Sequence, residues 1–322
     1  MIMNFYFGGK IMEKMYYEDQ YLREFVAEIT EIVNKDNLYY VKLDKTAFFP
    51  GGGGQHCDLG YIDNHKVINV IEEKGEIYHI TETKPIKIHR VNCKIDWDRR
   101  LDGMQQHLGQ HILSGCFFTL FNANTVSVHV GKEISTVDIQ GYLDEETIRK
   151  AEKMANEIIQ ENIKVEFLTP SKKELKKINL RRDLPNTDEQ IRIVKIGDLD
   201  INACCGVHPS RTLDVQVIKI KRWEKHKGAT RIEYLAGKRA INDYFKKDEF
   251  RNRICRFLNC GEDDAINSIN KLSNDLKNVL DENRQIKMEI SEYQIKDMIK
   301  EAKAVSRRPS GLRKTTLPFN SL

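Results

Sequence analysis

Two groups of residues, far apart in the chain, combine side chains that bind transition metals. His107 and His111 lie four residues apart in a segment with helical spacing of its apolar residues, which places both imidazoles on one helix face, one turn apart. The second group lies in the run from Cys204 to His208, in which two cysteines precede a glycine turn and a histidine. Three imidazoles and one thiolate are a ligand set typical of zinc, so the sequence predicts one Zn²⁺ per chain.

Each group alone has a simpler interpretation. A histidine pair on a helix is often a chance pair on the surface, and the His-Glu-x-x-His pattern of metalloproteases is absent here. Either Cys204 or Cys205 is able to reach a metal that His208 also binds, and spacing does not choose between them. The remaining thiol would be a small buried side chain. The presence of both groups in one chain favours the metal site.

Four consecutive glycines, Gly51, Gly52, Gly53 and Gly54, lie between two predicted strands and are followed by Gln55. Such a segment lets backbone approach a ligand closely. It is not a Walker A phosphate loop, because Gly-Lys-Ser or Gly-Lys-Thr is missing. The alternative interpretation is a flexible turn.

Basic residues gather in three places, although the net charge of +4 is too small to indicate a polyanionic partner by itself. Residues 219–231 contain six Lys or Arg and one acid, Glu224. Arg99-Arg100 and Arg181-Arg182 add two basic pairs. Basic stretches are usually solvated faces, but several of them around a metal cleft would position a phosphate backbone.

The periodicity of the sequence indicates an α+β protein. Short alternating runs with turns between them, from about residue 21 to 90, predict a small β-barrel or sandwich. Helical spacing follows over 97–120 and 144–162, with a short helix near 172–179. Strands are expected at 127–130, 135–139, 165–168 and 191–196. We expect a barrel domain (1–95) followed by a two-layer α/β domain (96–240).

Residues 241–305 are expected to be a helical segment. Apolar residues alternate spacings of four and three from Ala265 to Tyr293, which is a heptad pattern of about four repeats, and the single polar position is Asn283. Pairing with a second chain and a helical hairpin within one chain both explain this pattern. The tail 306–322 has no periodicity and is expected to be disordered.

Several classes of protein are excluded by composition. No apolar run approaches the roughly 18 residues of a membrane span, and no secretory signal is recognisable at the N-terminus. Seven scattered cysteines in a chain of this size suit a reducing compartment. We therefore expect a soluble cytoplasmic protein.

Five blocks of sequence together resemble the freestanding alanyl-tRNA editing proteins, the AlaX family, and the editing domain of alanyl-tRNA synthetase. The blocks occur in the family's order between about Tyr21 and Tyr244, and the second and fourth in combination are highly specific. The five blocks are Thr46–Gln55, Arg99–His111, Thr125–Gly131, Ala203–Pro209 and Arg231–Gly237.

This resemblance implies roles for particular residues. The metal ligands would be His107, His111, Cys204 and His208, since the family's cysteine lies four residues before its last histidine. Thr125 and Gln55 would act in catalysis, with Thr125 hydrogen-bonding a seryl hydroxyl. The glycine loop would fold over the site. The residues expected to bind substrate are Thr46, Gly51, Gly52, Gly53, Gly54 and Arg100.

The sequence departs from the family pattern at three places. His56 stands where the family usually has proline, and Cys205 and Val207 replace a glycine and a threonine typical of synthetase members. The chain also ends before the glycine-rich C-terminal domain of the longest relatives, which puts contact with the tRNA elbow in doubt.

The function implied is zinc-dependent removal of serine or glycine from mischarged tRNA(Ala), with a possible homodimer through the heptad segment. The alternative is a tRNA-binding module without catalysis, in which four protein ligands close a structural zinc site. A coiled-coil scaffold that has lost its enzymatic role is a third interpretation, less favoured because all four ligand positions are present.

Overall fold

The computed structural model describes residues 12–86, 90–182, 184 and 190–306. Contacts divide the chain into two compact units, Met1–Phe245 and Lys246–Leu322. The predicted division of the first unit into a 1–95 domain and a 96–240 domain stays a prediction. No described helix is long and apolar enough to cross a membrane.

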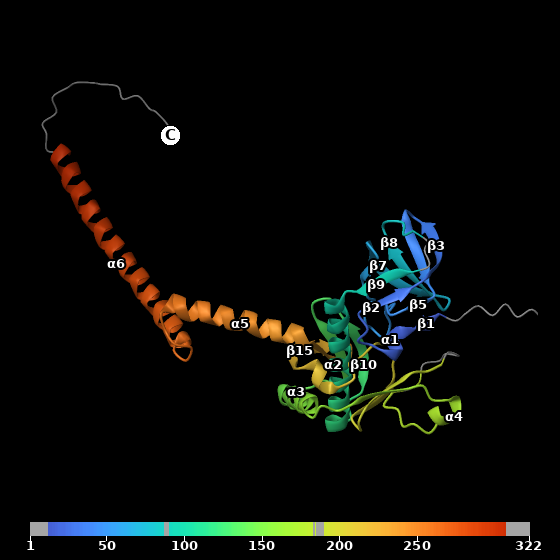
Figure 1. Ribbon diagram of the computed structural model, residues 1–322. Coiled ribbons are helices and arrows are strands. Elements are labelled where there is room, and N and C mark those ends of the chain that lie inside the picture. The colour runs from blue at the N-terminus through green and yellow to red at the C-terminus, as the bar shows by residue number, and fades with distance from the viewer. Residues whose placement is uncertain (1–11, 87–89, 183, 185–189, 307–322) are drawn as a thin grey trace, which may run out of the picture. The chain divides into compact units, whose positions relative to one another are not determined.

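A seven-stranded sheet with order β2-β9-β6-β7-β8-β4-β3 makes up most of the N-terminal part (Figure 1). The described edge strands β2 and β3 do not pair, so the sheet is open and the predicted β-barrel is wrong. Only Glu28 separates these two strands in the chain. The sheet's strands are β2 (Glu24–Ala27), β3 (Ile29–Lys35), β4 (Leu38–Leu43), β6 (Gly60–Ile62), β7 (His65–Glu73), β8 (Glu76–Thr81) and β9 (Val91–Ile95). Before it, β1 (Glu13–Lys14) leads into α1 (Met15–Glu18) and pairs in parallel with β5 (Lys45–Thr46).

The part of the first unit that follows β9 has an α+β architecture, as predicted. Its four-stranded antiparallel sheet has order β10-β11-β16-β15, and a three-stranded sheet has order β12-β13-β14. The strands are β10 (Thr125–Val130), β11 (Ser135–Gln140), β12 (Val165–Leu168), β13 (Ile193–Ile196), β14 (Asp200–Ala203), β15 (Ile218–His226) and β16 (Ala229–Ala236). The helices are α2 (Trp97–Phe121), α3 (Glu145–Gln160), α4 (Lys172–Leu175) and the 3₁₀ turn η1 (Thr212–Val215).

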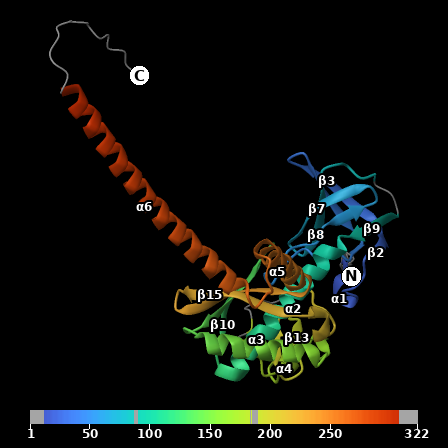
Figure 2. The same cartoon turned by 90° about the vertical axis from the view of Figure 1, so that its left-hand side faces the viewer.

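Helix α2 is the central element of this unit. Asp96 caps its start by accepting from the backbone N–H of Arg99 at 3.2 Å, and Asn122 ends it in the left-handed conformation. Every residue from Met104 to Phe117 is buried. Both views show α2 beginning beside β9 and passing the strands of the second layer, where it packs against α3 (Figures 1 and 2). A helix enclosed on all sides holds its side chains in fixed positions.

The C-terminal unit is helical. α5 (Gly237–Leu258) leads into it, and α6 (Ala265–Ser306) covers the whole predicted heptad segment as one helix. The seam side chains of α6 are exposed, for example Leu272 at 54% and Leu276 at 60%. The predicted tail, 306–322, lies outside the described residues except for Ser306.

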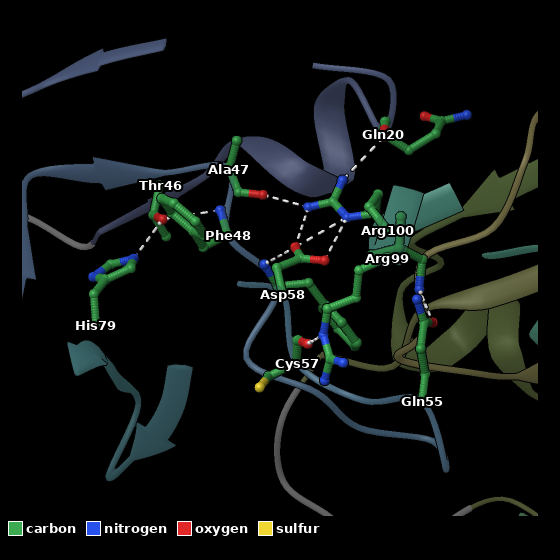
Figure 3. A network of polar contacts seen from close by, with 12 residues as sticks. Gln20, Thr46, Ala47, Phe48, Gln55, Cys57, Asp58, His79, Arg99 and Arg100 are labelled. Carbon is green, nitrogen blue, oxygen red and sulfur yellow. Dashed lines mark hydrogen bonds and ion pairs between the residues drawn. The ribbon is translucent and has the colours of Figure 1, made fainter. Parts of the chain in front are cut away.

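A buried ion pair connects α2 to the N-terminal sheet (Figure 3). The Arg100 side chain is fully enclosed and bonds both carboxylate oxygens of Asp58. It also donates to the carbonyls of Gln20 and Ala47, while Asp58 accepts from the N–H of Phe49 at 2.6 Å. The interaction therefore fixes both ends of the segment that contains the four glycines.

We expect Asp58→Ala to lower the free energy of unfolding by about 3–5 kcal/mol, because it leaves the Arg100 guanidinium buried without a counter-charge. Urea denaturation measures this value. The matched control is Glu24→Ala, which breaks the pair with Lys94 whose side chains are 66% and 68% exposed. The control should cost less than about 1 kcal/mol, and equal losses in the two variants would contradict the assignment.

Candidate metal centre

His107, His111, Cys204 and His208 converge in the structure. Each offers one ligand atom, and these four atoms all lie within 4.8 Å of one another. The Cys204 Sγ is 3.4 Å from His107 Nε2 and 3.6 Å from His208 Nε2. Atoms that bind one tetrahedral zinc at 2.0–2.3 Å lie roughly 3.3–3.8 Å apart, so a modest contraction brings this group to a zinc site.

The four residues of the cluster come from two segments of the chain. α2 presents His107 and His111 one turn apart, as the sequence predicts, and the turn that follows β14 supplies Cys204 and His208. Arg192 holds this turn by donating to the carbonyls of Cys204 and Gly206 at 3.2 and 2.9 Å. Its guanidinium lies between the rings of Tyr17 and Phe167. Sequence reasoning missed Arg192, because nothing local distinguishes it from a surface arginine.

The glycine at position 206 is required by the cluster itself. A Cβ built there would lie 2.2 Å from Cε1 and 2.3 Å from Nδ1 of His107. The imidazole therefore packs directly on the backbone of the cysteine turn, and a larger residue at this position would displace His107.

Gln55 determines which nitrogen of His107 faces the cluster. The Gln55 Oε1 accepts from the backbone N–H of Val207 and lies 3.0 Å from His107 Nδ1. An amide oxygen only accepts, so Nδ1 carries the proton and Nε2 presents its lone pair to the cluster. Gln55, predicted to act in catalysis, thus contacts a predicted metal ligand.

Asp200 has the same effect on His111. Its Oδ2 lies 2.7 Å from His111 Nδ1, and Arg181 bonds its Oδ1 at 2.6 Å. Nε2 of His111 is buried and has no hydrogen-bond partner among the described residues. A buried ring nitrogen without a polar partner, on a ring that a carboxylate holds from the other side, fits a metal ligand. Sequence reasoning missed Asp200, because an aspartate at the first position of a short strand is not distinguished by its sequence from an exposed turn residue.

Charge within the cluster also suits a cation. Burial disfavours the Cys204 thiolate, but the neighbouring imidazoles of His107 and His208 hold the pKa of Cys204 well below its usual range. Burial lowers the pKa of His208 to about 3, which keeps that ring neutral. Burial also opposes a charge on His111, yet the neighbouring Asp200 and Cys204 raise its pKa to about 9, so a metal ion that binds this ring displaces a proton from Nε2.

The glycine loop lies against this cluster. All four glycines have positive φ, a conformation that favours glycine. A Cβ on Gly53 would be 3.1 Å from His107 Cε1, and one on Gly52 would be 3.1 Å from the Cys205 Sγ. The loop closes with reciprocal backbone hydrogen bonds between Gly52 and Gln55 at 3.0 Å. It is therefore an ordered turn whose backbone borders the predicted metal ligands.

Thr125 lies in a buried polar network behind His111. Its hydroxyl donates to Ser114 Oγ at 2.8 Å and accepts from Arg181 at 3.3 Å, and Gln110 donates to the same Ser114 oxygen. Since Arg181 also bonds Asp200, Thr125 is connected to a predicted metal ligand through two side chains.

Three residues predicted to contact nucleic acid or substrate are directed into the protein instead. Arg100 is 1% exposed and uses its donors on Asp58 and backbone carbonyls. Arg181, one of the predicted basic pairs, is buried against Asp200. Thr46 is fully buried and bonds His79 at 2.8 Å and the N–H of Phe48. Local sequence cannot separate these inward side chains from exposed ones.

Comparison with known proteins connects this geometry to a family. Residues 191–233, which supply β13, β14 and the cysteine turn, match the family Threonyl and Alanyl tRNA synthetase second additional domain. The alanyl-tRNA editing protein AlaX-L of Pyrococcus horikoshii is 34% identical over 308 residues, covering 90% of this chain and 74% of that protein.

Vertebrate proteins with the same kind of name are also similar to this chain, although they are longer. The alanyl-tRNA editing protein Aarsd1 of Bos taurus is 33% identical over 80% of this chain and 62% of its own length. The Mus musculus protein of the same name is 32% identical over 74% of this chain and 59% of its own length. Similarity that extends over most of the chain, together with the metal-ligand cluster, identifies this protein as a member of the alanyl-tRNA editing proteins, a family of deacylating hydrolases.

Proposed function

We propose that this protein hydrolyses the ester that joins serine or glycine to the 3′-terminal ribose of mischarged tRNA(Ala), at a zinc site formed by His107, His111, Cys204 and His208. The observation that carries the proposal is that the four ligand atoms lie close together. Gln55 and Asp200 bind Nδ1 of His107 and His111, so that Nε2 of each ring faces the other ligand atoms. The family of the chain supports the same reaction.

Each group of residues at the site has its own role in hydrolysis of the ester. A zinc ion bound by the four ligands would supply Lewis acidity to the ester carbonyl or to a water. Gln55 and Asp200 hold the rings of His107 and His111 in one tautomer, so no ring has to reorient when the metal or the substrate binds. The backbone of Gly52 and Gly53 packs directly on Cys205 and His107, so the loop borders the cluster with backbone groups alone.

The discrimination against alanine follows from buried polar groups. The proton of the Thr125 hydroxyl goes to Ser114 and one lone pair accepts from Arg181, which leaves one lone pair to accept from the seryl hydroxyl. Alanine has no such donor and forgoes a hydrogen bond worth about 0.5–1.5 kcal/mol. Arg181 and Ser114 already fix the direction of the Thr125 hydroxyl, so it is preorganised for one hydrogen bond. This role is the one that the sequence resemblance implies.

A second candidate function is tRNA binding without catalysis. It is favoured by one observation, that four protein side chains complete a tetrahedral set, as in structural zinc sites. A protein of this kind would bind metal and tRNA but leave the ester intact. Activity, rather than metal content, therefore separates the two candidates.

We expect the parent protein to deacylate seryl- and glycyl-tRNA(Ala) faster than alanyl-tRNA(Ala), and His107→Ala to lose at least about 100-fold in rate, because a three-ligand site binds zinc more weakly. Release of labelled amino acid from the three tRNAs measures this. The control is His65→Ala, a histidine on β7 that bonds Thr83 instead of the cluster. Equal rates in the parent and His107→Ala would remove the cluster from the mechanism.

Thr125→Val tests the specificity assignment, since it keeps the shape of the side chain and removes the hydroxyl. We expect the ratio of kcat/KM for seryl- over alanyl-tRNA(Ala) to fall about 10-fold, with activity toward glycyl-tRNA(Ala) changed less. Thr230→Val is the matched control, because Thr230 is equally buried but bonds the carbonyl of Gly141. An unchanged seryl-to-alanyl ratio in Thr125→Val would contradict the assignment.

We also propose that α6 pairs with the same helix of a second copy. Its heptad side chains are exposed along the helix, and one polar residue, Asn283, interrupts an apolar seam in the manner that fixes register in dimers.

The seven cysteines are free, which is consistent with the proposal that the protein acts in the reducing cytoplasm.

The double variant Leu272→Glu/Leu276→Glu tests this pairing in the full-length chain, because two charges in the seam oppose burial. Light scattering after size exclusion should give twice the chain mass for the parent and the single mass for the variant. Lys277→Glu/Asp281→Lys, which exchanges charges on α6 outside the apolar seam, should stay dimeric. A parent protein of single-chain mass would refute the pairing.

A further inference from the structure

A surface pocket of about 440 Å³ lies within the first compact unit, one side chain away from the metal cluster. Gly103 of α2 lines it, and a Cβ on Gly103 would meet the Gln55 side chain at 3.2 Å. Gln55 in turn contacts His107, which lies one turn further along the same helix. The pocket and the cluster therefore share the Gln55–His56 segment and one turn of α2.

The pocket is lined by more cations than anions. Arg99, Lys132, Lys238 and Arg239 contribute four positive charges, against Asp98 and Asp102. Two of the cations are neutralised, because Lys238 pairs with Asp98 at 2.9 Å and Arg239 pairs with Asp102. Arg99 and Lys132 have no ion pair among the described residues.

These two unpaired cations remain available to a ligand. Arg99 donates its Nε to the carbonyl of Cys57 at 2.8 Å, which fixes the guanidinium and leaves its terminal nitrogens to project from this anchor (Figure 3). Lys132 is exposed on the turn between β10 and β11. A rigid guanidinium and a mobile ammonium at one pocket are a common arrangement for phosphate oxygens.

The field inside the pocket supports the same assignment. Partial burial and then the charges of Arg99, His129, Arg239 and Lys132 lower the pKa of His56, which lines the pocket. All four neighbouring groups act in the same direction, as expected where positive charges converge on an unfilled anion site.

We propose that this pocket binds phosphodiester groups of the 3′-terminal nucleotides of the tRNA, with Arg99 and Lys132 as the principal contacts. The proposal rests on the proposed function, because it takes the ester to be at the metal cluster. The ester and the 5′-phosphate belong to the same terminal nucleoside. A substrate that reaches the cluster therefore also brings a backbone phosphate to the surface beside it, and this pocket adjoins the cluster through Gln55 and contains two unpaired cations.

The experiment measures binding of an uncharged RNA minihelix that ends in the single-stranded tRNA 3′ end, by fluorescence anisotropy at several salt concentrations. Lys132→Gln should raise Kd about five- to tenfold and lower the slope of log Kd against log salt by about 0.7, the value for one lost contact to single-stranded phosphate. Lys132→Arg, which keeps the charge, should bind like the parent protein. Lys153→Gln is the control, because Lys153 is 80% exposed on α3 and does not line the pocket.

A second RNA locates the contact. A minihelix without its single-stranded 3′ nucleotides should bind the parent and Lys132→Gln equally, since the phosphates assigned to the pocket are gone. A Kd of Lys132→Gln within twofold of the parent on the complete minihelix overturns the proposal. An equal loss on the truncated RNA also overturns it, because Lys132 would then contact the duplex.

These readouts are separate from the test of the proposed function. Because the RNA carries no amino acid, binding does not depend on hydrolysis of an ester. A protein that shows the Lys132 effect but deacylates no tRNA would contradict the proposed function alone. A protein that deacylates mischarged tRNA while Lys132→Gln binds normally would contradict the pocket alone.

Discussion

The enclosure of the Cys204 thiolate among three imidazoles is the interaction on which the rest of this structure depends. A buried charge is stable only when its partners hold fixed positions, and these partners come from segments almost a hundred residues apart in the chain. The fold meets this requirement with one rigid helix. α2 is buried over its central four turns and packs in the same core as β13 and the strands of the four-stranded sheet, so His107 and His111 meet the cysteine turn at a constant distance.

The N-terminal part of the chain takes part in the site through Gln55 and through Tyr17, whose hydroxyl donates to the carbonyl of Cys205 at 2.6 Å. Gln55 reaches from the glycine loop to His107, whereas His111 is held from the other side by Asp200. The two supports differ in charge: a neutral amide faces His107, whereas a carboxylate faces His111 and makes that ring a stronger donor of electrons to a metal. The buried pair of Arg100 and Asp58 fixes the loop that carries Gln55. The first sheet therefore influences metal geometry although it contributes no ligand.

Local patterns in the sequence were sufficient for the long helices and for the two groups of metal-binding residue types. Helical spacing predicted α2 with His107 and His111 on one face, but spacing left Cys204 and Cys205 open, and only the resemblance to a family indicated Cys204. Long-range pairing was not readable: alternation predicts strands but does not determine whether the outer strands β2 and β3 bond to each other, and they do not. The direction of Arg100 and Arg181 was also hidden, because their acidic partners lie 42 and 19 residues away.

The network behind His111 joins two properties that are usually treated separately. Thr125, the residue proposed to distinguish serine from alanine, is bonded to Arg181, and Arg181 is bonded to the carboxylate that orients His111. Because these groups are buried and mutually hydrogen-bonded, a shift of one changes the partners of the next. A substitution that alters the recognition of the amino acid at Thr125 will therefore also alter the position of Asp200. The role proposed for Thr125 in recognising the amino acid and the role proposed for His111 as a metal ligand are therefore physically coupled.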